Sequence, residues 1–84
     1  MSMFRLSNRQ IDVVNVLSPG AASDEVVHIE LVGMGWGCSR AEARATLETL
    51  KARGLAAQDE KDFSVFMLTF AGYAYASGYK RGGE

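Results

Sequence analysis

The segment from Ser39 to Gly54 constrains the fold of this chain most, because it predicts a helix with a defined start and a defined end. Ser39 and Glu42 form a capping box, in which each side chain accepts a hydrogen bond from a backbone N–H at the helix start. Gly54 follows the helix, and glycine readily adopts the left-handed conformation that ends one. Apolar residues at helical spacing give this helix a buried face, made of Ala43, Leu47 and Leu50.

Two earlier helices are predicted from local patterns of the same kind. Ser7 and Gln10 form a second capping box, and Ser18-Pro19-Gly20 ends the helix that follows it. Ser23 is a suitable cap for another helix. A glycine-rich turn over residues 33–38 then leads to the helix described above.

An extended pattern follows Gly54. Residues 55–58 and residues 63–68 are rich in apolar side chains, and the polar segment Asp59-Glu60-Lys61-Asp62 separates them. Two short extended runs around a polar tip are typical of a β-hairpin.

These elements, in this order and at this spacing, resemble a winged helix-turn-helix domain of the kind found in MarR and PadR type bacterial regulators. The resemblance rests on the helix capped by Ser39, on Gly54-Leu55 and on Leu68-Thr69-x-x-Gly72, and it covers residues 7–72. It implies an α+β fold with three helices, a two-stranded wing and a C-terminal helix from about 69 to 80. It implies one domain over residues 1–84 and a transcriptional regulator that binds duplex DNA with the helix after Ser39 in the major groove.

The helix after Ser39 carries the residues that we expect to contact DNA. Arg40, Arg44 and Lys51 form a basic stripe on its exposed side, and small side chains beside the stripe would let the backbone approach a major groove. The predicted DNA-binding residues are Ser39, Arg40, Ala41, Arg44, Ala45 and Lys51, with Lys61 on the wing. In an alternative interpretation this face is only solvated, and Arg44 and Lys51 pair with Glu48.

The charge distribution favours a second class of function. The formal net charge is −1, and the predicted wing places three acids around Lys61. Asp24 and Glu25 open the second helix, where such domains often lie near a phosphate. These negative charges would repel DNA, so the alternative function is a protein–protein interaction module that does not bind nucleic acid.

The C-terminal segment predicts a homodimer. In the helix capped by Thr69, Phe70 and Tyr73 share one side, while Tyr75 and Tyr79 share the roughly opposite side. One domain can cover one side, and a second subunit is the simplest cover for the other. The predicted interface residues are Phe66, Tyr75 and Tyr79. Alternatively, both tyrosines lie over their own domain with their hydroxyls in water.

Other classes of protein are disfavoured by what the sequence lacks. No apolar run approaches the ~18 residues of a membrane span and no signal peptide precedes the first predicted helix, so we expect a soluble cytoplasmic protein without a membrane partner. One cysteine and one histidine are too few for a structural zinc site, and the glycine-rich turn lacks the ending of a phosphate-binding loop. We expect no catalytic residues, no metal and no cofactor. Trp36 and Cys38 are predicted to lie in the core, and His28 to have a solvated or capping role.

Overall fold

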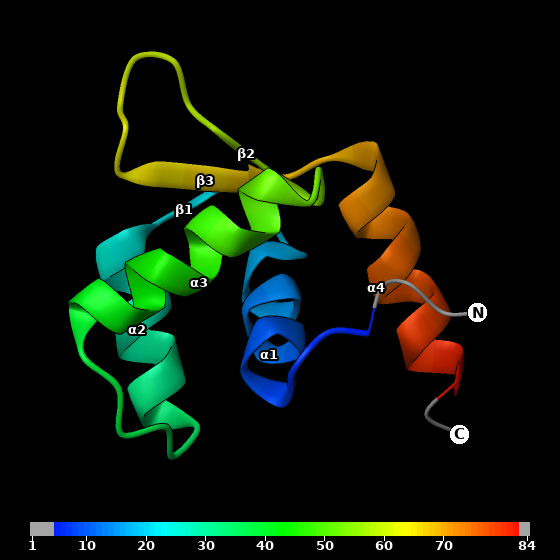
Figure 1. The fold of residues 1–84 in the computed structure, drawn as a ribbon, viewed down its shortest axis with the longest axis horizontal. Helices are drawn as coiled ribbons and strands as arrows, with labels where there is room; N and C mark the ends of the chain where they lie inside the picture. Colours follow the sequence, from blue (N-terminus) through cyan, green and yellow to red (C-terminus); the bar gives the residue numbers. More distant parts are fainter. Residues whose placement is uncertain (1–4, 83–84) are drawn as a thin grey trace.

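The computed structural model describes the backbone of residues 5–82 and the side chains of residues 5–76. The described residues form four helices and one small antiparallel sheet. The helices are α1 (Asn8–Leu17), α2 (Asp24–Gly33), α3 (Arg40–Ala52) and α4 (Phe70–Gly82), and the strands are β1 (Ala22–Ser23), β2 (Ala56–Gln58) and β3 (Val65–Leu68). Their order along the chain is α1, β1, α2, α3, β2, β3, α4. In Figure 1, α1 lies between α2 and α4, and α3 crosses in front of α2 and α1. The expected α+β fold is confirmed.

The starts of the first three helices are the predicted ones. Both capping boxes are complete. The Ser7 and Ser39 hydroxyls accept from the N–H groups of Gln10 and Glu42. In return, the side chains of Gln10 and Glu42 accept from the N–H groups of Ser7 and Ser39. Ser23 caps α2 by accepting from the Val26 N–H at 3.1 Å. Local side-chain hydrogen bonds therefore set these three boundaries.

The sheet has one strand more than expected. The predicted hairpin is present as β2 and β3, but β1 also pairs with β3, so the strand order is β1-β3-β2. Ala22 lies opposite Phe66 in this register. In addition, the Asp24 N–H donates to the Ser64 carbonyl at 2.7 Å, which continues the link between the start of α2 and the start of β3. β3 is therefore the central strand, and the loop before it, called the wing here (residues 59–64), projects beyond the sheet (Figure 1).

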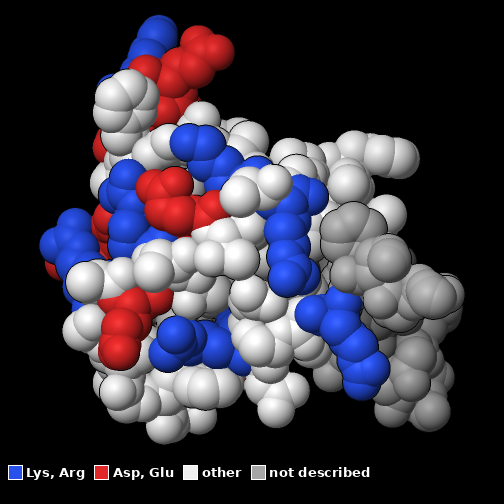
Figure 2. Space-filling model, in the orientation of Figure 1, with Lys and Arg blue, Asp and Glu red and all other residues white. Residues whose placement is uncertain are grey.

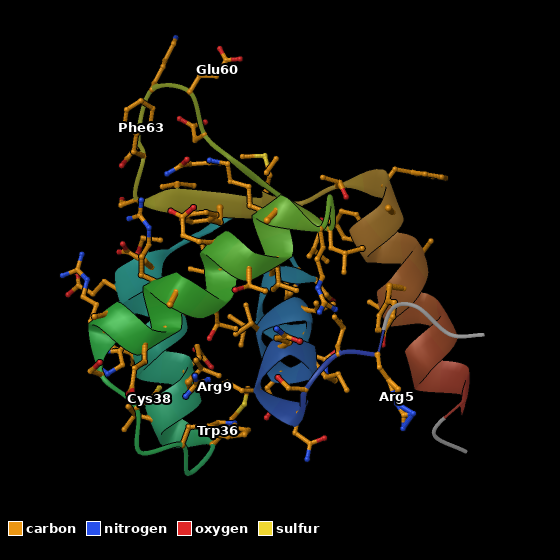
Figure 3. All side chains as sticks on the ribbon, in the orientation of Figure 1. Arg5, Arg9, Trp36, Cys38, Glu60 and Phe63 are labelled. Carbon is orange, nitrogen blue, oxygen red and sulfur yellow. The ribbon has the colours of Figure 1, made fainter. Side chains whose placement is uncertain are left out.

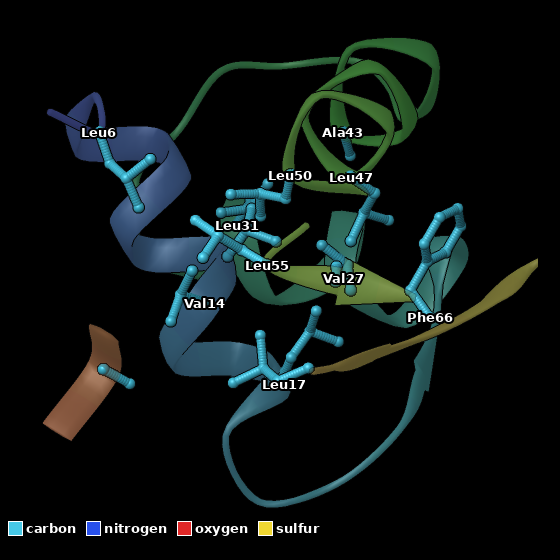
Figure 4. Close-up of a cluster of buried hydrophobic side chains, with 14 of the residues drawn as sticks. Leu6, Val14, Leu17, Val27, Leu31, Ala43, Leu47, Leu50, Leu55 and Phe66 are labelled. Atoms are coloured by element: carbon cyan, nitrogen blue, oxygen red, sulfur yellow. The ribbon is translucent and has the colours of Figure 1, made fainter. Parts of the chain in front are cut away.

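The core lies where α1, α2 and α3 meet the sheet. Its largest fully buried side chains are Phe66, Leu17, Leu31, Leu47, Leu50, Val13, Val14 and Val27. Figure 4 shows labelled members of this cluster from the three helices and the sheet converging on one another. Leu47 and Leu50 are buried, as the helical spacing predicts, and Leu55 is buried with them.

Phe66 was predicted at a subunit interface, and this prediction is wrong. Its side chain is completely buried within the single chain. Phe66 belongs to the core cluster with residues of α1, α2 and α3, so the protein's own helices cover its face of β3. No atom of the side chain is left for a second subunit to contact.

The buried and exposed sides of α4 are the opposite of those predicted. Tyr75 is half-buried and packs against the core, while Phe70 is 90% exposed and Tyr73 is 44% exposed. Tyr75 was assigned to a subunit interface because it shares a side with Tyr79. The structure turns the Tyr75 side toward its own domain, and the side chain of Tyr79 lies outside the described residues.

One threonine joins the end of α3 to the start of α4. The Thr69 hydroxyl donates to the Gly54 carbonyl at 2.7 Å and accepts from the Gly72 N–H at 3.1 Å. Gly54 has a φ of 79°, in the left-handed region that ends helices. Gly72 is buried, and a Cβ placed on it would collide with the carbonyl of Leu55. The two glycine motifs that suggested the fold are therefore in direct contact.

The residues of the turn between α2 and α3 have structural roles. Cys38 is buried, and Trp36 is partly buried against the core, as expected. The Trp36 indole N–H donates to Asp12 at 2.7 Å, and the Arg9 guanidinium lies 5.8 Å from the centre of its ring. His28 was expected to be solvated or to cap a helix; instead its Nε2 lies 2.9 Å from the carbonyl of Cys38, in the turn before the N-cap of α3. Within the described part of the chain, no helix is long and apolar enough to cross a membrane.

Candidate nucleic-acid interface

The outer face of α3 presents small and basic side chains to solvent. Ser39, Arg40, Ala41, Ala45 and Lys51 are all exposed; the two alanines lie opposite the buried leucines, and Arg40 and Lys51 lie at the edge of the exposed face. Figure 2 shows Lys and Arg side chains gathered over this face of the molecule, with acidic side chains among them and at the wing. The backbone of a helix with alanines on its outer side can approach another surface closely.

Arg40 and Arg44 both bind the carboxylate of Asp24, at the start of α2. Asp24 Oδ1 accepts from Arg40 Nη2 at 3.0 Å, and Asp24 Oδ2 accepts from Arg44 Nη1 at 2.8 Å. The Asp24 side chain is only 7% exposed, so this pair of bonds ties the start of α2 to the start of α3. Asp24 was expected to face DNA and repel it; instead its charge is buried and balanced. Glu25, the next residue, remains exposed.

Arg44 is fixed from three directions. Besides the bond to Asp24, its Nε donates to Glu48 Oε2 at 3.0 Å, and its guanidinium lies 5.1 Å from the centre of the Phe66 ring. The hydrogen bonds that Arg44 donates to Glu48 and Asp24 raise the pKa of Arg44 above its ordinary value, so it stays charged. The ion pair between Arg44 and Glu48 that the alternative interpretation predicted is therefore present.

Asp24 is ionised in this setting. Burial of the carboxylate raises its pKa, but hydrogen bonds from Arg44 and Arg40, together with their positive charges, outweigh that effect. The net result is a pKa below the ordinary value of 3.8. The carboxylate therefore carries its full negative charge at neutral pH.

Lys51 connects α3 to the wing rather than to Glu48. Its Nζ donates to Gln58 Oε1 at 2.7 Å, and Gln58 Nε2 donates to the Phe63 carbonyl at 2.6 Å. Because Gln58 is neutral, the charge of Lys51 is not balanced by this contact. Arg53, near the end of α3, is also exposed and forms no ion pair with another described residue.

Two of the wing acids organise the loop. Asp59 Oδ2 accepts from the N–H groups of Lys61 and Asp62, and Asp62 Oδ1 accepts from both the N–H and the hydroxyl of Ser64. These are the local turns that Asp commonly forms. The hydroxyl and N–H of Ser64 lower the pKa of Asp62 below its ordinary value. Lys61, which was predicted to contact DNA, is exposed on this acidic loop.

Glu60 and Phe63 point outward from the wing. Figure 3 shows both side chains away from the helices, on the projecting loop. Phe63 is 67% exposed, so the wing presents an aromatic ring as well as charge. No group of three or more described His, Cys, Asp or Glu side chains could hold a metal ion.

The architecture is that of a winged helix. Three solved structures with a similar fold are RosR, AdcR and ZitR. RosR of H. salinarum matches with a TM-score of 0.77 at 19% identity, over 90% of this chain and 72% of its own. The adhesin competence repressor AdcR from Streptococcus pyogenes matches with 0.72 at 22% identity, over 93% of this chain and 57% of its own. A variant of Lactococcus lactis ZitR matches with a TM-score of 0.74 at 16% identity, over 93% of this chain and 53% of its own.

These likenesses establish the winged-helix fold. The chain spans little more than half the length of ZitR and AdcR. Neither a protein-family model nor a curated protein sequence matches it.

Proposed function

We propose that this chain is a MarR/PadR-type, DNA-binding transcriptional regulator that acts in the cytoplasm as a dimer of single winged-helix domains, with α3 in the major groove. The observation that carries the proposal is the exposed face of α3, with its alanines and its basic side chains. The repressor named among the structures of the same shape supports it. Nothing in the described site suggests catalysis, so the proposed activity is binding.

We divide the basic residues of α3 and its end into two groups. Arg40 and Arg44 lie at the start of α3, where such helices reach base edges, and their charges are already paired with Asp24. Lys51 and Arg53 lie at the other end, and their charges are available for phosphates. We therefore assign non-specific attraction to Lys51 and Arg53, and base contacts to Arg40 and Arg44.

The dimer that we propose uses the exposed side of α4. Phe70 and Tyr73 are large, exposed and adjacent at helical spacing, so a second copy of this helix could cover them around a two-fold axis. This replaces the interface predicted from the sequence, because Phe66 and Tyr75 serve the protein's own core.

A salt titration tests the proposed function. Binding of the purified protein to a random-sequence duplex should weaken steeply as salt rises from about 50 mM to about 200 mM. Lys51→Ala and Arg53→Ala should each lower the slope of log K against log salt by about 0.9, the value for one phosphate. Arg5→Ala is the matched control, because it removes the same charge beside α4, away from α3 (Figure 3). Absence of binding at about 50 mM salt would show that the proposal is wrong.

A protein-interaction module is the second candidate, and one observation favours it. The outer side of α2 and its end expose four large apolar side chains, each 45–59% accessible: Val26, Ile29, Val32 and Met34. A groove of about 430 Å³ beside them is lined in part by Val16, Pro19 and Ala22. If the protein does not bind DNA, this surface becomes the principal candidate for its function.

A further inference from the structure

The start of the α3 face contains a cluster of four charged groups whose charges cancel. Asp24 accepts from both Arg40 and Arg44, and Glu48 accepts from Arg44, at distances of 2.8–3.0 Å. Two carboxylates therefore balance two guanidinium groups. The Asp24 carboxylate is buried at the centre of the cluster, while the Arg40 and Arg44 side chains are 56% and 34% exposed.

A balanced arginine differs from a free one in what it can bind. Non-specific affinity for DNA comes from net positive charge, because each phosphate that the protein neutralises releases counterions. An arginine that is already paired with a carboxylate adds little to this effect. Its remaining N–H donors can still form hydrogen bonds with base acceptors such as the O6 and N7 atoms of guanine. Arg44 uses Nε and Nη1 within the cluster, and Arg40 uses Nη2, so each guanidinium retains a terminal nitrogen outside these bonds.

The cluster also restricts where the donors point. Both oxygens of Asp24 are occupied, and the Phe66 ring lies beneath the Arg44 guanidinium. A side chain that is fixed before binding loses less conformational entropy when it meets a ligand of the matching shape. It also adapts less well to a ligand of a different shape.

We propose that Asp24 is a specificity-determining residue, which, with Glu48, keeps Arg40 and Arg44 charge-balanced and fixed, so that they favour a duplex with matching base acceptors over the phosphates of any duplex. This inference rests on the proposed DNA binding and adds to it. It gives Asp24 an effect opposite to that of a general affinity residue, because loss of its charge strengthens non-specific binding.

The experiment compares three variants that each remove one negative charge. Asp24→Asn keeps the size of the side chain and one acceptor oxygen. Glu48→Gln releases Arg44 from the exposed side of the cluster, where no folding defect is expected. Glu42→Gln is the control: it lies on the same helix, keeps its capping box and contacts neither arginine. The probes are a duplex selected by the wild-type protein from a random-sequence pool and a scrambled duplex of the same composition.

The expected results separate the cluster from a general charge effect. Asp24→Asn should bind the scrambled duplex more tightly, with a salt slope steeper by about 0.9, and should discriminate between the two duplexes about tenfold less than wild type. Glu48→Gln should shift in the same direction, and it carries the test if Asp24→Asn does not fold. Glu42→Gln should keep the wild-type discrimination.

The outcomes also distinguish this inference from the function on which it rests. If wild type binds DNA but the Asp24 and Glu48 variants behave as Glu42→Gln does, the inference is wrong and the DNA-binding proposal stands. Discrimination that rises in Asp24→Asn would also overturn the inference. If wild type selects no sequence and binds neither duplex at low salt, both proposals are wrong.

Discussion

The Thr69 hydroxyl donates a hydrogen bond of 2.7 Å to the carbonyl of Gly54, across fifteen positions of the sequence. This bond and the one from the Thr69 N–H to the Leu55 carbonyl, at 3.1 Å, hold the start of α4 against the end of α3. Gly72 completes the contact, because only a residue without a Cβ fits against that carbonyl.

Gly72→Ala should therefore destabilise the protein. The added Cβ would collide with a backbone carbonyl, which cannot rotate away as a side chain does, so α4 must shift. We expect a loss of about 1–3 kcal/mol or more in the free energy of unfolding, measured with urea. Gly33→Ala is a matched control with the opposite sign: it lies in α2, nothing surrounds its Cβ position, and alanine is the better helix former by about 1 kcal/mol. Equal effects of the two changes would contradict the packing described here.

Leu47→Ala should remove a core side chain from α3. Leu47 is fully buried, so we expect a loss of about 2–5 kcal/mol in urea unfolding, including the cost of the cavity. Thr49→Ala, an exposed site on the same helix, should change stability by only about 0.5 kcal/mol. A Leu47 variant as stable as wild type would show that α3 does not pack on this face.

The ion pairs of Asp24 should make stability fall in acid. The pKa of Asp24 is lower in the folded protein than its ordinary value of 3.8, so folding favours the ionised form. Its contribution is complete above the ordinary pKa and is lost as pH falls through the lower folded pKa. Asp24→Asn should therefore be less stable than wild type at pH 7, by about 1.5–3 kcal/mol, and this difference should shrink in strong acid.

A control is needed because Asp62 also has a lowered pKa. Asp62 is exposed, so Asp62→Asn should change the pH dependence of unfolding much less. An Asp24→Asn variant whose stability runs parallel to that of wild type at every pH would refute the assignment.

The α4 interface predicts the oligomeric state. Wild type should sediment at about twice the chain mass at micromolar concentration, and Phe70→Glu with Tyr73→Glu should shift it to monomer. Phe63→Glu serves as the control, since it places one negative charge on another exposed aromatic, in the wing. A wild-type monomer, or a dimer that tolerates the double change, would exclude this interface.

Removing negative charge from the wing should change DNA affinity in the opposite direction from removing basic residues. Asp59→Asn with Asp62→Asn removes two negative charges while keeping an acceptor oxygen for each turn. If the wing approaches DNA, affinity for a random-sequence duplex should rise, and the salt slope should steepen by up to about 0.9 per charge. Glu30→Gln, on α2, provides the comparison for charge alone. An unchanged affinity would mean that the wing stays away from the duplex.

Local patterns predicted the elements of this fold, and long-range contacts decided the details that they missed. The capping boxes at Ser7 and Ser39 involve residues three positions apart, so the sequence alone specifies them. The bonds that Arg40 and Arg44 donate to Asp24 span sixteen and twenty positions and have no local signature. Charge pattern alone could not show that these arginines were already paired.

The side of α4 that is buried could have been predicted from the sequence. Both of its sides carry aromatic residues, so hydrophobicity does not choose between them. Gly72, however, lies at helical spacing from Tyr75 and Ala76, and a glycine within a helix often marks a close approach of two backbones. The strand β1 gave less warning, because two residues are too few to show an alternating pattern.

The contacts between the wing and α2 have a mechanical consequence. β1 runs directly into α2 and pairs with β3, and the first N–H of α2 also bonds to the Ser64 carbonyl. The hairpin is thus braced at its base by the same backbone that begins a core helix. The same α2 is tied to α3 by the ion pairs of Asp24, so the base of the hairpin and the start of α3 are joined through one short helix. A surface that this protein binds through both the wing and α3 must therefore present its two contact points at the distance that separates these elements.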